Sequence, residues 1–335
     1  AQAENLTAHL GQSNIIAKLN TGNSDSFNSG LDTTVFTKER CGMMFQQIMK
    51  SADMEWGGFG KAPKFPQTFT VQYLLQYFHY EKNEQALNQA LLSIDKMLEG
   101  GIYDHVAGGL ARYSTDNEWL APHFEKMLYD NALLINILCD AARITGNKKY
   151  EKAVLKTISF VQNELTDRDN SFFAAIDADS EGVEGKFYVW QKDEIDKLLG
   201  DDAPLFCRYF DVTETGNWEH QNILRILQPV GMFCKTVQMV EEVFEIHINE
   251  CLDKLNKERN KRIRPALDDK IILSWNALML TAIAKASAAF GNREFRELAI
   301  ANYNFIKNQF YIRNDGAEMY HTYKNGIAKV PAFLD

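Results

Sequence analysis

The sequence predicts an all-α fold, an incomplete (α/α) toroid of helical hairpins with a small β-hairpin insertion. Two kinds of helical pattern alternate along the chain, and short polar turns join them in pairs. One kind is apolar on every side, which indicates burial on every side, whereas the other is apolar on one face only. Buried inner helices favour a closed toroid, because an open solenoid would expose one side of them to water.

Successive helix pairs carry this pattern. They are residues 68–82 with 84–99, 123–143 with 147–165, and 270–290 with 292–310. The joints "TGNKK" and "FGNRE" are short and polar, which indicates antiparallel helical hairpins. Further helices are predicted at 36–52 and 236–257.

A phrase that occurs twice supports an internal repeat. "HFEKMLYDNALL" begins at His123, and "DDKIILSWNALML" begins at Asp268. Each has an acid–Lys pair, an apolar spacer and Asn-Ala-Leu, so we interpret them as the N-terminal ends of equivalent inner helices. Equivalent ends of inner helices lie at one end of a toroid. The polar residues around them are therefore expected to converge on one mouth.

The domain organisation follows from this array. Residues 1–335 are predicted to form a single toroid domain, itself a piece of a longer chain, with residues 1–35 as a linker or N-terminal extension. Residues 171–230 are expected to be an insertion, with a β-hairpin and short helices near 191–199 and 202–210. Because the array is truncated, we expect exposed apolar helix edges, which could pair two chains into a homodimer.

The composition of the chain limits which partners it can bind. The net charge of −9 argues against a nucleic-acid surface, and no run of about 20 apolar residues suits a membrane span. The five cysteines are far apart and form no C-x-x-C, which favours a cytoplasmic setting. "DADSEG" begins at Asp177 like a calcium loop, but Tyr188 stands where the loop needs Glu. We therefore expect no metal and no cofactor.

Acids and aromatic residues before the inner helices suit a sugar, since carboxylates do acid/base work and rings stack on pyranose faces. The catalytic candidates are Glu125, Asp269, Asp179 and His123. The substrate-binding candidates are Tyr103, Asp104, His105, Arg112, Trp119, Asp177, Asp268, Trp275 and Asn276. We expect Glu125 or Asp269 to be the proton donor, with a pKa raised by apolar neighbours, and the other acid or Asp179 to hold water. His123 would orient the sugar or act as a base.

Several of these residues have structural alternatives. Glu125 and Asp269 are expected in the first turns of their helices, where the helix dipole alone favours an acid. Asp268 is equally an N-cap, and both tryptophans could be core residues. Asp130 is predicted on the helix face of His123, where it could meet the same cavity or make a core hydrogen bond.

The longer motifs resemble a known family. "GGFGKAPKFPQ", "GGIYDHVAGGLARYSTDNEWLAPHFEKMLYDNALL", "DADSEGVEGKFYVW" and "DDKIILSWNALML" look like the thioredoxin-fused six-hairpin family, which includes the spermatogenesis-associated thioredoxin-like proteins. The resemblance runs from about Gly57 to Asp335. It implies a preceding thioredoxin-like domain, which would be a partner in the full-length chain. It also implies a toroid similar to six-hairpin glycosidases and N-acylglucosamine 2-epimerases, whose His pair could be supplied here by His105 and His123.

Two functions are carried forward. The first is binding or processing of a small sugar or glycan, by glycoside hydrolysis or epimerisation at the mouth. The alternative is a non-catalytic scaffold that docks a thioredoxin-like domain and its clients. Hydrolysis needs two acids facing a cleft, about 6.5–9.5 Å apart for inversion or about 5 Å for retention. A scaffold would satisfy its acids internally, with Arg or backbone N–H groups.

Overall fold

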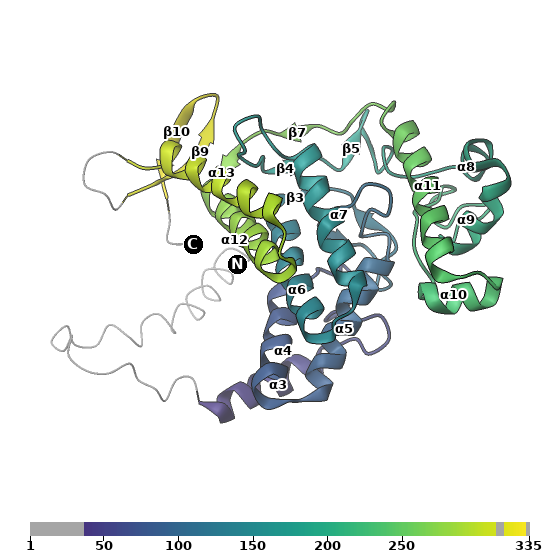
Figure 1. The fold of residues 1–335 in the computed structure, drawn as a ribbon, viewed down its shortest axis with the longest axis horizontal. Coiled ribbons are helices and arrows are strands. Elements are labelled where there is room, and N and C mark those ends of the chain that lie inside the picture. The colour runs from purple at the N-terminus through teal and green to yellow at the C-terminus, as the bar shows by residue number, and fades with distance from the viewer. Residues whose placement is uncertain (1–36, 313–317, 333–335) are drawn as a thin grey trace, which may run out of the picture. The chain divides into compact units, whose positions relative to one another are not determined.

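Helices dominate the residues that the computed structural model describes, which are 37–312 and 318–332 (Figure 1). The helices are α3 (Lys38–Lys50), α4 (Thr68–Glu81), α5 (Glu84–Glu99), α6 (Leu128–Thr145), α7 (Lys148–Glu164), α8 (Lys192–Leu199), the 3₁₀ turn η1 (Gly200–Asp202), α9 (Ala203–Tyr209), α10 (Val230–Val237), α11 (Glu241–Arg259), α12 (Leu273–Phe290) and α13 (Arg293–Gln309). The strands are β1 (Tyr113–Ser114), β2 (Pro122–His123), β3 (Lys126–Met127), β4 (Ala175–Ile176), β5 (Asp179–Ser180), β6 (Val183–Glu184), β7 (Leu267–Asp268), β8 (Ile271–Ile272), β9 (Tyr320–Lys324) and β10 (Ile327–Pro331). The predicted linker at residues 1–35 lies outside the described residues.

Within the described residues, three helical hairpins form as predicted: α4–α5, α6–α7 and α12–α13. At each joint a residue in the left-handed conformation ends the first helix, and an Asn caps the second. These pairs are Lys82–Asn83, Gly146–Asn147 and Gly291–Asn292. Each Asn side chain accepts a hydrogen bond from a backbone N–H in the first turn of the second helix. The local sequence thus stops one helix and starts the next with no intervening loop.

The first helices of the hairpins pack side by side. α6 lies between α4 and α12 and contacts both of them (Figure 1). From Leu128 to Cys139 every residue of α6 except Tyr129 is buried. The second helices, α5, α7 and α13, bury a single face each. Inner helices buried all round and outer helices buried on one side form an arc of an (α/α) toroid, which confirms the predicted fold class.

Short strands bring the starts of two inner helices to the same end of the arc. β4 pairs antiparallel with both β3 and β7, with Lys126 opposite Ile176 and Ala175 opposite Asp268. β3 runs directly into α6, and β7 with β8 precedes α12. α6 and α12 therefore begin at one end, as the repeated phrase predicts.

The predicted helix starts are wrong by a few residues. α6 begins at Leu128 and α12 at Leu273, because the preceding residues are extended in β2, β3, β7 and β8. Glu125 and Asp269 therefore lie in extended segments and not in first helical turns. The N-cap position of α12 is Ile272, so the alternative that Asp268 caps this helix is also wrong.

The repeated Asn-Ala-Leu has a structural role. The side-chain amide of Asn131 accepts from the N–H of Leu110 at 2.8 Å, and it donates to Leu110 O at 3.2 Å and to Met127 O at 2.8 Å. Asn276 does the same with Phe172, at 2.9 Å in both directions, and donates to Ile272 O at 3.0 Å. Each fully buried amide thus fixes an extended segment against the first turn of an inner helix.

Replacing Asn276 with Ala is expected to lower the free energy of unfolding by about 1–3 kcal/mol, because the buried N–H and C=O of Phe172 lose their partner. Urea denaturation of the variant measures this cost. Asn163→Ala is a suitable control, since Asn163 is an exposed residue of the outer helix α7. An equal change in both variants would contradict the structural role of the amide.

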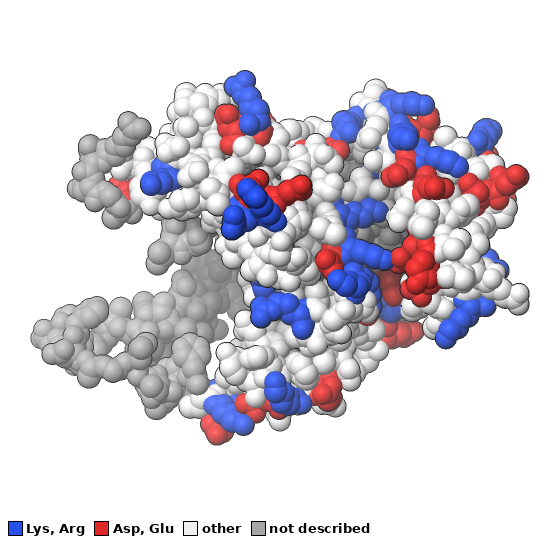
Figure 2. Space-filling view, viewed as in Figure 1, with Lys and Arg blue, Asp and Glu red and all other residues white. Residues whose placement is uncertain are grey.

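The segment between α7 and α12 has its own core. Buried side chains on and next to α8, α9, α10 and α11 pack together, among them Trp190, Phe206, Phe210, Phe244 and Leu255. None of the helices in the described part of the chain is long and apolar enough to cross a lipid bilayer. On the face shown in Figure 2, basic side chains gather next to acidic ones.

Candidate active site at the start of the inner helices

The strongest candidate site lies where α6 begins. Arg112 Nη1 donates to Glu125 Oε2 at 2.8 Å, and His123 Nε2 lies 3.7 Å from the same oxygen. His123 Nδ1 is 2.7 Å from Glu184 Oε1 of β6, and its ring stacks on Tyr113 at 5.0 Å between centroids. The side chain of Glu125 is 25% exposed and that of His123 is 27% exposed. A carboxylate, an imidazole and a guanidinium therefore share one partly open place.

Asp130 adds a second carboxyl group to this place. It is buried, and its Oδ2 has no hydrogen-bond partner among the described residues. Burial raises the pKa of Asp130 to about 7, and the negative charge of Glu125 adds to the rise, while Arg112 and Tyr129 oppose it. A large fraction of Asp130 therefore carries a proton at neutral pH. In the sequence, Asp130 is marked as a candidate because it is an acid in a helix that is otherwise apolar on every side.

A cleft with Tyr129, the neighbour of Asp130, in its wall runs along the inner helices. It has a volume of about 460 Å³. Its lining includes Phe69 of α4, Tyr129 and Leu133 of α6, and Trp275 and Leu278 of α12. The rings of Tyr129 and Trp275 meet edge to face at 4.9 Å. Burial raises the pKa of the Tyr129 hydroxyl, the charge of Asp130 raises it further, and Arg112 lowers it. Tyr129 therefore connects the cleft to Asp130 and to Arg112, which holds Glu125.

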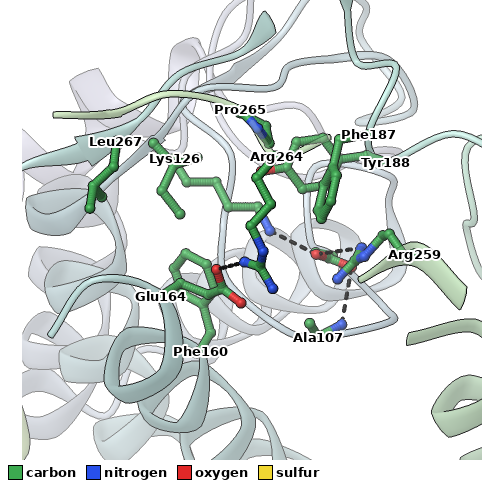
Figure 3. Close-up of a pocket in the computed structure, with 12 residues that line it drawn as sticks. Ala107, Lys126, Phe160, Glu164, Phe187, Tyr188, Arg259, Arg264, Pro265 and Leu267 are labelled. Carbon is green, nitrogen blue, oxygen red and sulfur yellow. Dashed lines mark hydrogen bonds and ion pairs between the residues drawn. The ribbon is translucent and has the colours of Figure 1, made fainter. Parts of the chain in front are cut away.

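Asp104 lies in a different environment, a buried ion cluster with Lys126 and Arg259. Figure 3 shows these two cations. Its carboxylate accepts from Lys126 Nζ at 2.8 Å and from Arg259 Nη1 at 2.9 Å to both oxygens. The backbone N–H groups of Val106 and Ala107 also donate to it. Burial alone would raise the pKa of Asp104, but the charges of Arg259 and Lys126 outweigh it and hold the pKa well below its ordinary value.

Aromatic rings surround the two cations of this cluster. Lys126 Nζ lies 4.7 Å from the ring centres of both Phe160 and Tyr188, and Arg259 lies 5.2 Å from that of Phe187. The adjoining pocket of about 230 Å³ is also lined by Arg264, which is paired with Glu164. Since every one of these charges has a partner of opposite sign, the cluster is built to hold the structure together. Nothing in the local sequence around Lys126 or Arg259 predicts that both meet Asp104.

Tyr103 and His105 face another cleft, of about 320 Å³, between the outer helices α5 and α7 and the segment α9–α11. Burial lowers the pKa of His105 to about 4, so its ring is neutral at neutral pH. One ring nitrogen lies 3.0 Å from Gly100 O, and the ring packs on Tyr103 and Phe210. His123 instead stacks on Tyr113, so the two histidines have separate surroundings and form no pair.

Trp119 and Asn276 are core residues. Both are fully buried, and the Trp119 indole N–H donates to Trp56 O at 2.8 Å. Lys64, also fully buried, lies over the Trp119 ring at 5.1 Å. A Cβ at Gly58 would come within 2.6 Å of this ring, which is why the "GGFG" loop needs glycine there. Neither side chain offers a free surface to a ligand in this conformation.

The remaining predicted acids are exposed or half-buried. Asp177 is joined to the segment before β7 through its N–H, which donates to Ala266 O at 2.8 Å. Asp179 lies opposite Glu184 in the β5–β6 hairpin.

Two further acids precede α12. Asp268 pairs with Lys270 at 3.1 Å, and Asp269 pairs with Lys324 of β9. Both side chains are more than two fifths exposed. Only some of the predicted site residues therefore lie together at one end of the arc. Arg112 and Glu125 act on the charge of Asp130, and His123 lies beside Glu125. Trp275 lines the 460 Å³ cleft, which Tyr129 shares.

Within residues 37–312 and 318–332, one group of three side chains is close enough together to bind a metal ion. It consists of Asp202, His247 and Cys251, and it lies outside the clusters described above.

Comparison with known proteins gives relatives in sequence and similar structures. No family model matches the chain. Spermatogenesis-associated protein 20 of Homo sapiens is 31% identical over an alignment of 297 positions, which covers 80% of this chain and 38% of that protein. An uncharacterised protein of Caenorhabditis elegans is 32% identical over 292 residues, 78% of this chain and 40% of its own length.

A family 76 glycoside hydrolase (mannosidase) of Bacteroides thetaiotaomicron has a similar solved structure. The TM-score is 0.48 and the identity 10%, over 81% of this chain and 53% of that one. At this score the likeness carries no inference about a substrate. The identity of 31% to spermatogenesis-associated protein 20 is stronger evidence than this structural likeness, and it agrees with the motifs in the sequence. The chain is therefore a homologue of spermatogenesis-associated protein 20, and it spans about two fifths of the length of these relatives.

Proposed function

We propose that the cleft beside α6 and α12 binds a sugar and carries out acid/base chemistry on it, by glycoside hydrolysis or epimerisation. One observation carries the proposal. A carboxyl group that holds a proton near neutral pH, Asp130, lies beside a second carboxylate, Glu125, that Arg112 orients. Two carboxyl groups with different tasks are the machinery that most glycosidases use.

The roles follow from the surroundings of each group. Asp130 would supply the proton to a leaving or ring oxygen, since its pKa of about 7 suits a general acid. Glu125, held by Arg112, would accept a proton from water or from the sugar. The Trp275 and Tyr129 rings at 4.9 Å from each other would contact the apolar face of a pyranose. Turnover should fall as the pH rises through about 7, because Asp130 then loses its proton.

The scaffold alternative is supported by a different observation. Asp104, Asp268 and Asp269 all have cationic partners, as a docking platform would require. Asp130 does not fit this description, because one of its oxygens has no partner. The thioredoxin-like partner domain, a homodimer and a cytoplasmic location stay predictions.

A sugar-binding screen tests the proposal. Thermal shift with a panel of monosaccharides and disaccharides, followed by a glycan array, is expected to find a sugar that raises the melting temperature of the wild-type chain. Trp275→Ala should remove this shift. Glu125→Gln and Asp130→Asn should lower any turnover by about 10²–10⁴-fold, as loss of an acid or base does.

Asp140→Asn is the matched control, since Asp140 lies on the same helix α6 and pairs with Lys285 at 2.6 Å. It should keep both binding and turnover. If sugar binding persists unchanged in Trp275→Ala, the sugar binds at a place other than this cleft. If no sugar binds the wild type, the scaffold alternative becomes the better account.

A further inference from the structure

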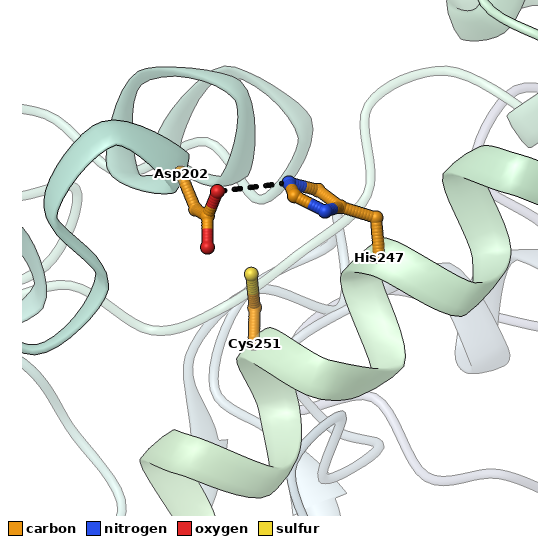
Figure 4. A group of neighbouring side chains, drawn as sticks. All are labelled: Asp202, His247 and Cys251. Carbon is orange, nitrogen blue, oxygen red and sulfur yellow. Dashed lines mark ion pairs between the residues drawn. The ribbon is translucent and has the colours of Figure 1, made fainter.

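Three side chains with different metal-ligating atoms meet beside α11 (Figure 4). They are Asp202 at the end of η1 and His247 and Cys251 of α11, and one ligand atom of each lies within 4.8 Å of the others. His247 Nε2 is 3.2 Å from Asp202 Oδ1. In Figure 4 the Cys251 sulfur points toward the space beside the Asp202 carboxylate and the His247 ring.

The helix and the packing around it explain this meeting. His247 and Cys251 are four residues apart, so they lie on the same face of α11. The core shared by α8, α9 and α11, which includes Ile195, Phe206 and Leu255, holds η1 against that face. Cys251 is fully buried, whereas the side chains of Asp202 and His247 are 28% and 33% exposed. The group is therefore closed at the sulfur and open to solvent on the opposite side.

We propose that Asp202, His247 and Cys251 bind a zinc-class divalent cation, with water as the fourth ligand. A carboxylate oxygen, an imidazole nitrogen and a thiolate sulfur suit Zn²⁺, whereas Mg²⁺ and Ca²⁺ prefer oxygen ligands alone. Ligands about 2.0–2.3 Å from a tetrahedral ion lie about 3.3–3.8 Å from one another. The three atoms lie within 4.8 Å of one another, so shifts of about an ångström would bring them to this separation. Binding releases the Cys251 thiol proton to solvent, because the thiolate is the ligand.

A fourth residue supports the orientation of the carboxylate. Lys254 Nζ is 3.1 Å from Asp202 Oδ2, on the same carboxylate whose Oδ1 faces His247. Lys254 can therefore hold one oxygen while the other binds the ion, as outer partners of metal ligands do. The ion would tie α11 to the α8–α9 segment. The sequence predicts no metal, because short local motifs are its only guide to metal ligands. Ligands at positions 202, 247 and 251 form no such motif, and only the fold brings them together.

Cobalt substitution tests the site with a spectroscopic readout. The 335-residue chain, stripped of metal with a chelator, is titrated with Co²⁺ and then with Zn²⁺. We expect one Co²⁺ per chain, a thiolate-to-cobalt charge-transfer band in the near ultraviolet, and displacement of Co²⁺ by Zn²⁺. Cys251→Ala should abolish the band, and His247→Ala should weaken Co²⁺ affinity by about 100-fold or more.

Cys234→Ala is the control, because Cys234 is also buried in the core of this segment but lies outside the group. It should keep the band and the affinity. His247 is partly exposed, so His247→Ala provides a readout even if Cys251→Ala fails to fold. The proposal is overturned if the wild type shows no thiolate band, or if His247→Ala binds Co²⁺ as tightly as the wild type.

Discussion

Asp104→Ala is expected to lower the free energy of unfolding by about 3–5 kcal/mol, because it leaves two buried cations without a counter-charge. The side chains of Lys126 and Arg259 are each 3% exposed, and both pair with this one carboxylate. The backbone N–H groups of Val106 and Ala107 also lose their acceptor. A cost of this size is a large part of the stability of an ordinary domain.

Urea denaturation followed by circular dichroism measures the effect. Asp193→Ala is the matched control, since Asp193 and Lys197 form a surface pair on α8 with both side chains more than 70% exposed, and it should cause no measurable change. Adding Lys126→Met to Asp104→Ala should recover part of the loss by removing one unpaired charge. If Asp104→Ala were as mild as Asp193→Ala, the cluster would not be holding α11 to the inner helix segment.

Asp130→Asn is expected to stabilise the chain above pH 7 and to leave its stability nearly unchanged near pH 4. The folded-state pKa of Asp130 is about 7, against about 3.9 for an ordinary Asp. Between these values the folded chain keeps a proton that the unfolded chain releases, so stability falls as the pH rises. The difference between these two pKa values corresponds to a penalty of about 4 kcal/mol above pH 7, which Asn does not incur.

Denaturation of wild type and variant at pH 4.5 and pH 8 measures this difference. Asp140→Asn should show no such gain at pH 8, because Asp140 is paired with Lys285. A variant that is stabilised while its sugar chemistry is lost would identify Asp130 as a residue kept at a cost in stability. An Asp130→Asn chain that is less stable than the wild type at pH 8 would show that the carboxylate has an unrecognised stabilising partner.

The hairpins could be predicted from the sequence because their signals are local. Helical periodicity, left-handed joints such as Gly146 and Gly291, and the Asn caps after them all act within a few residues. The helix starts at Leu128 and Leu273 were missed because pairing among β3, β4 and β7 overrides local helix propensity. That pairing joins segments far apart in the chain, which a periodic pattern cannot reveal.

The candidate site was predictable only in part for the same reason. Glu125 and Trp275 stand in the repeated phrases, and an acid in the apolar helix pointed to Asp130. The partners of Asp104, by contrast, are Lys126 and Arg259, and Arg259 is 155 residues away. The sequence predicts Asp104 as a sugar-binding residue because nothing near it in the chain shows that its charge is already neutralised.

The most direct test of the central claim is a titration of the Asp130 carboxyl carbon by ¹³C NMR in a chain labelled at aspartate, with Asp130→Asn to identify the resonance. The proposed acid/base function predicts a midpoint near pH 7, so that a large fraction of Asp130 holds a proton at neutral pH. A midpoint near the ordinary value of about 3.9 would contradict it, since the site would then have no proton donor.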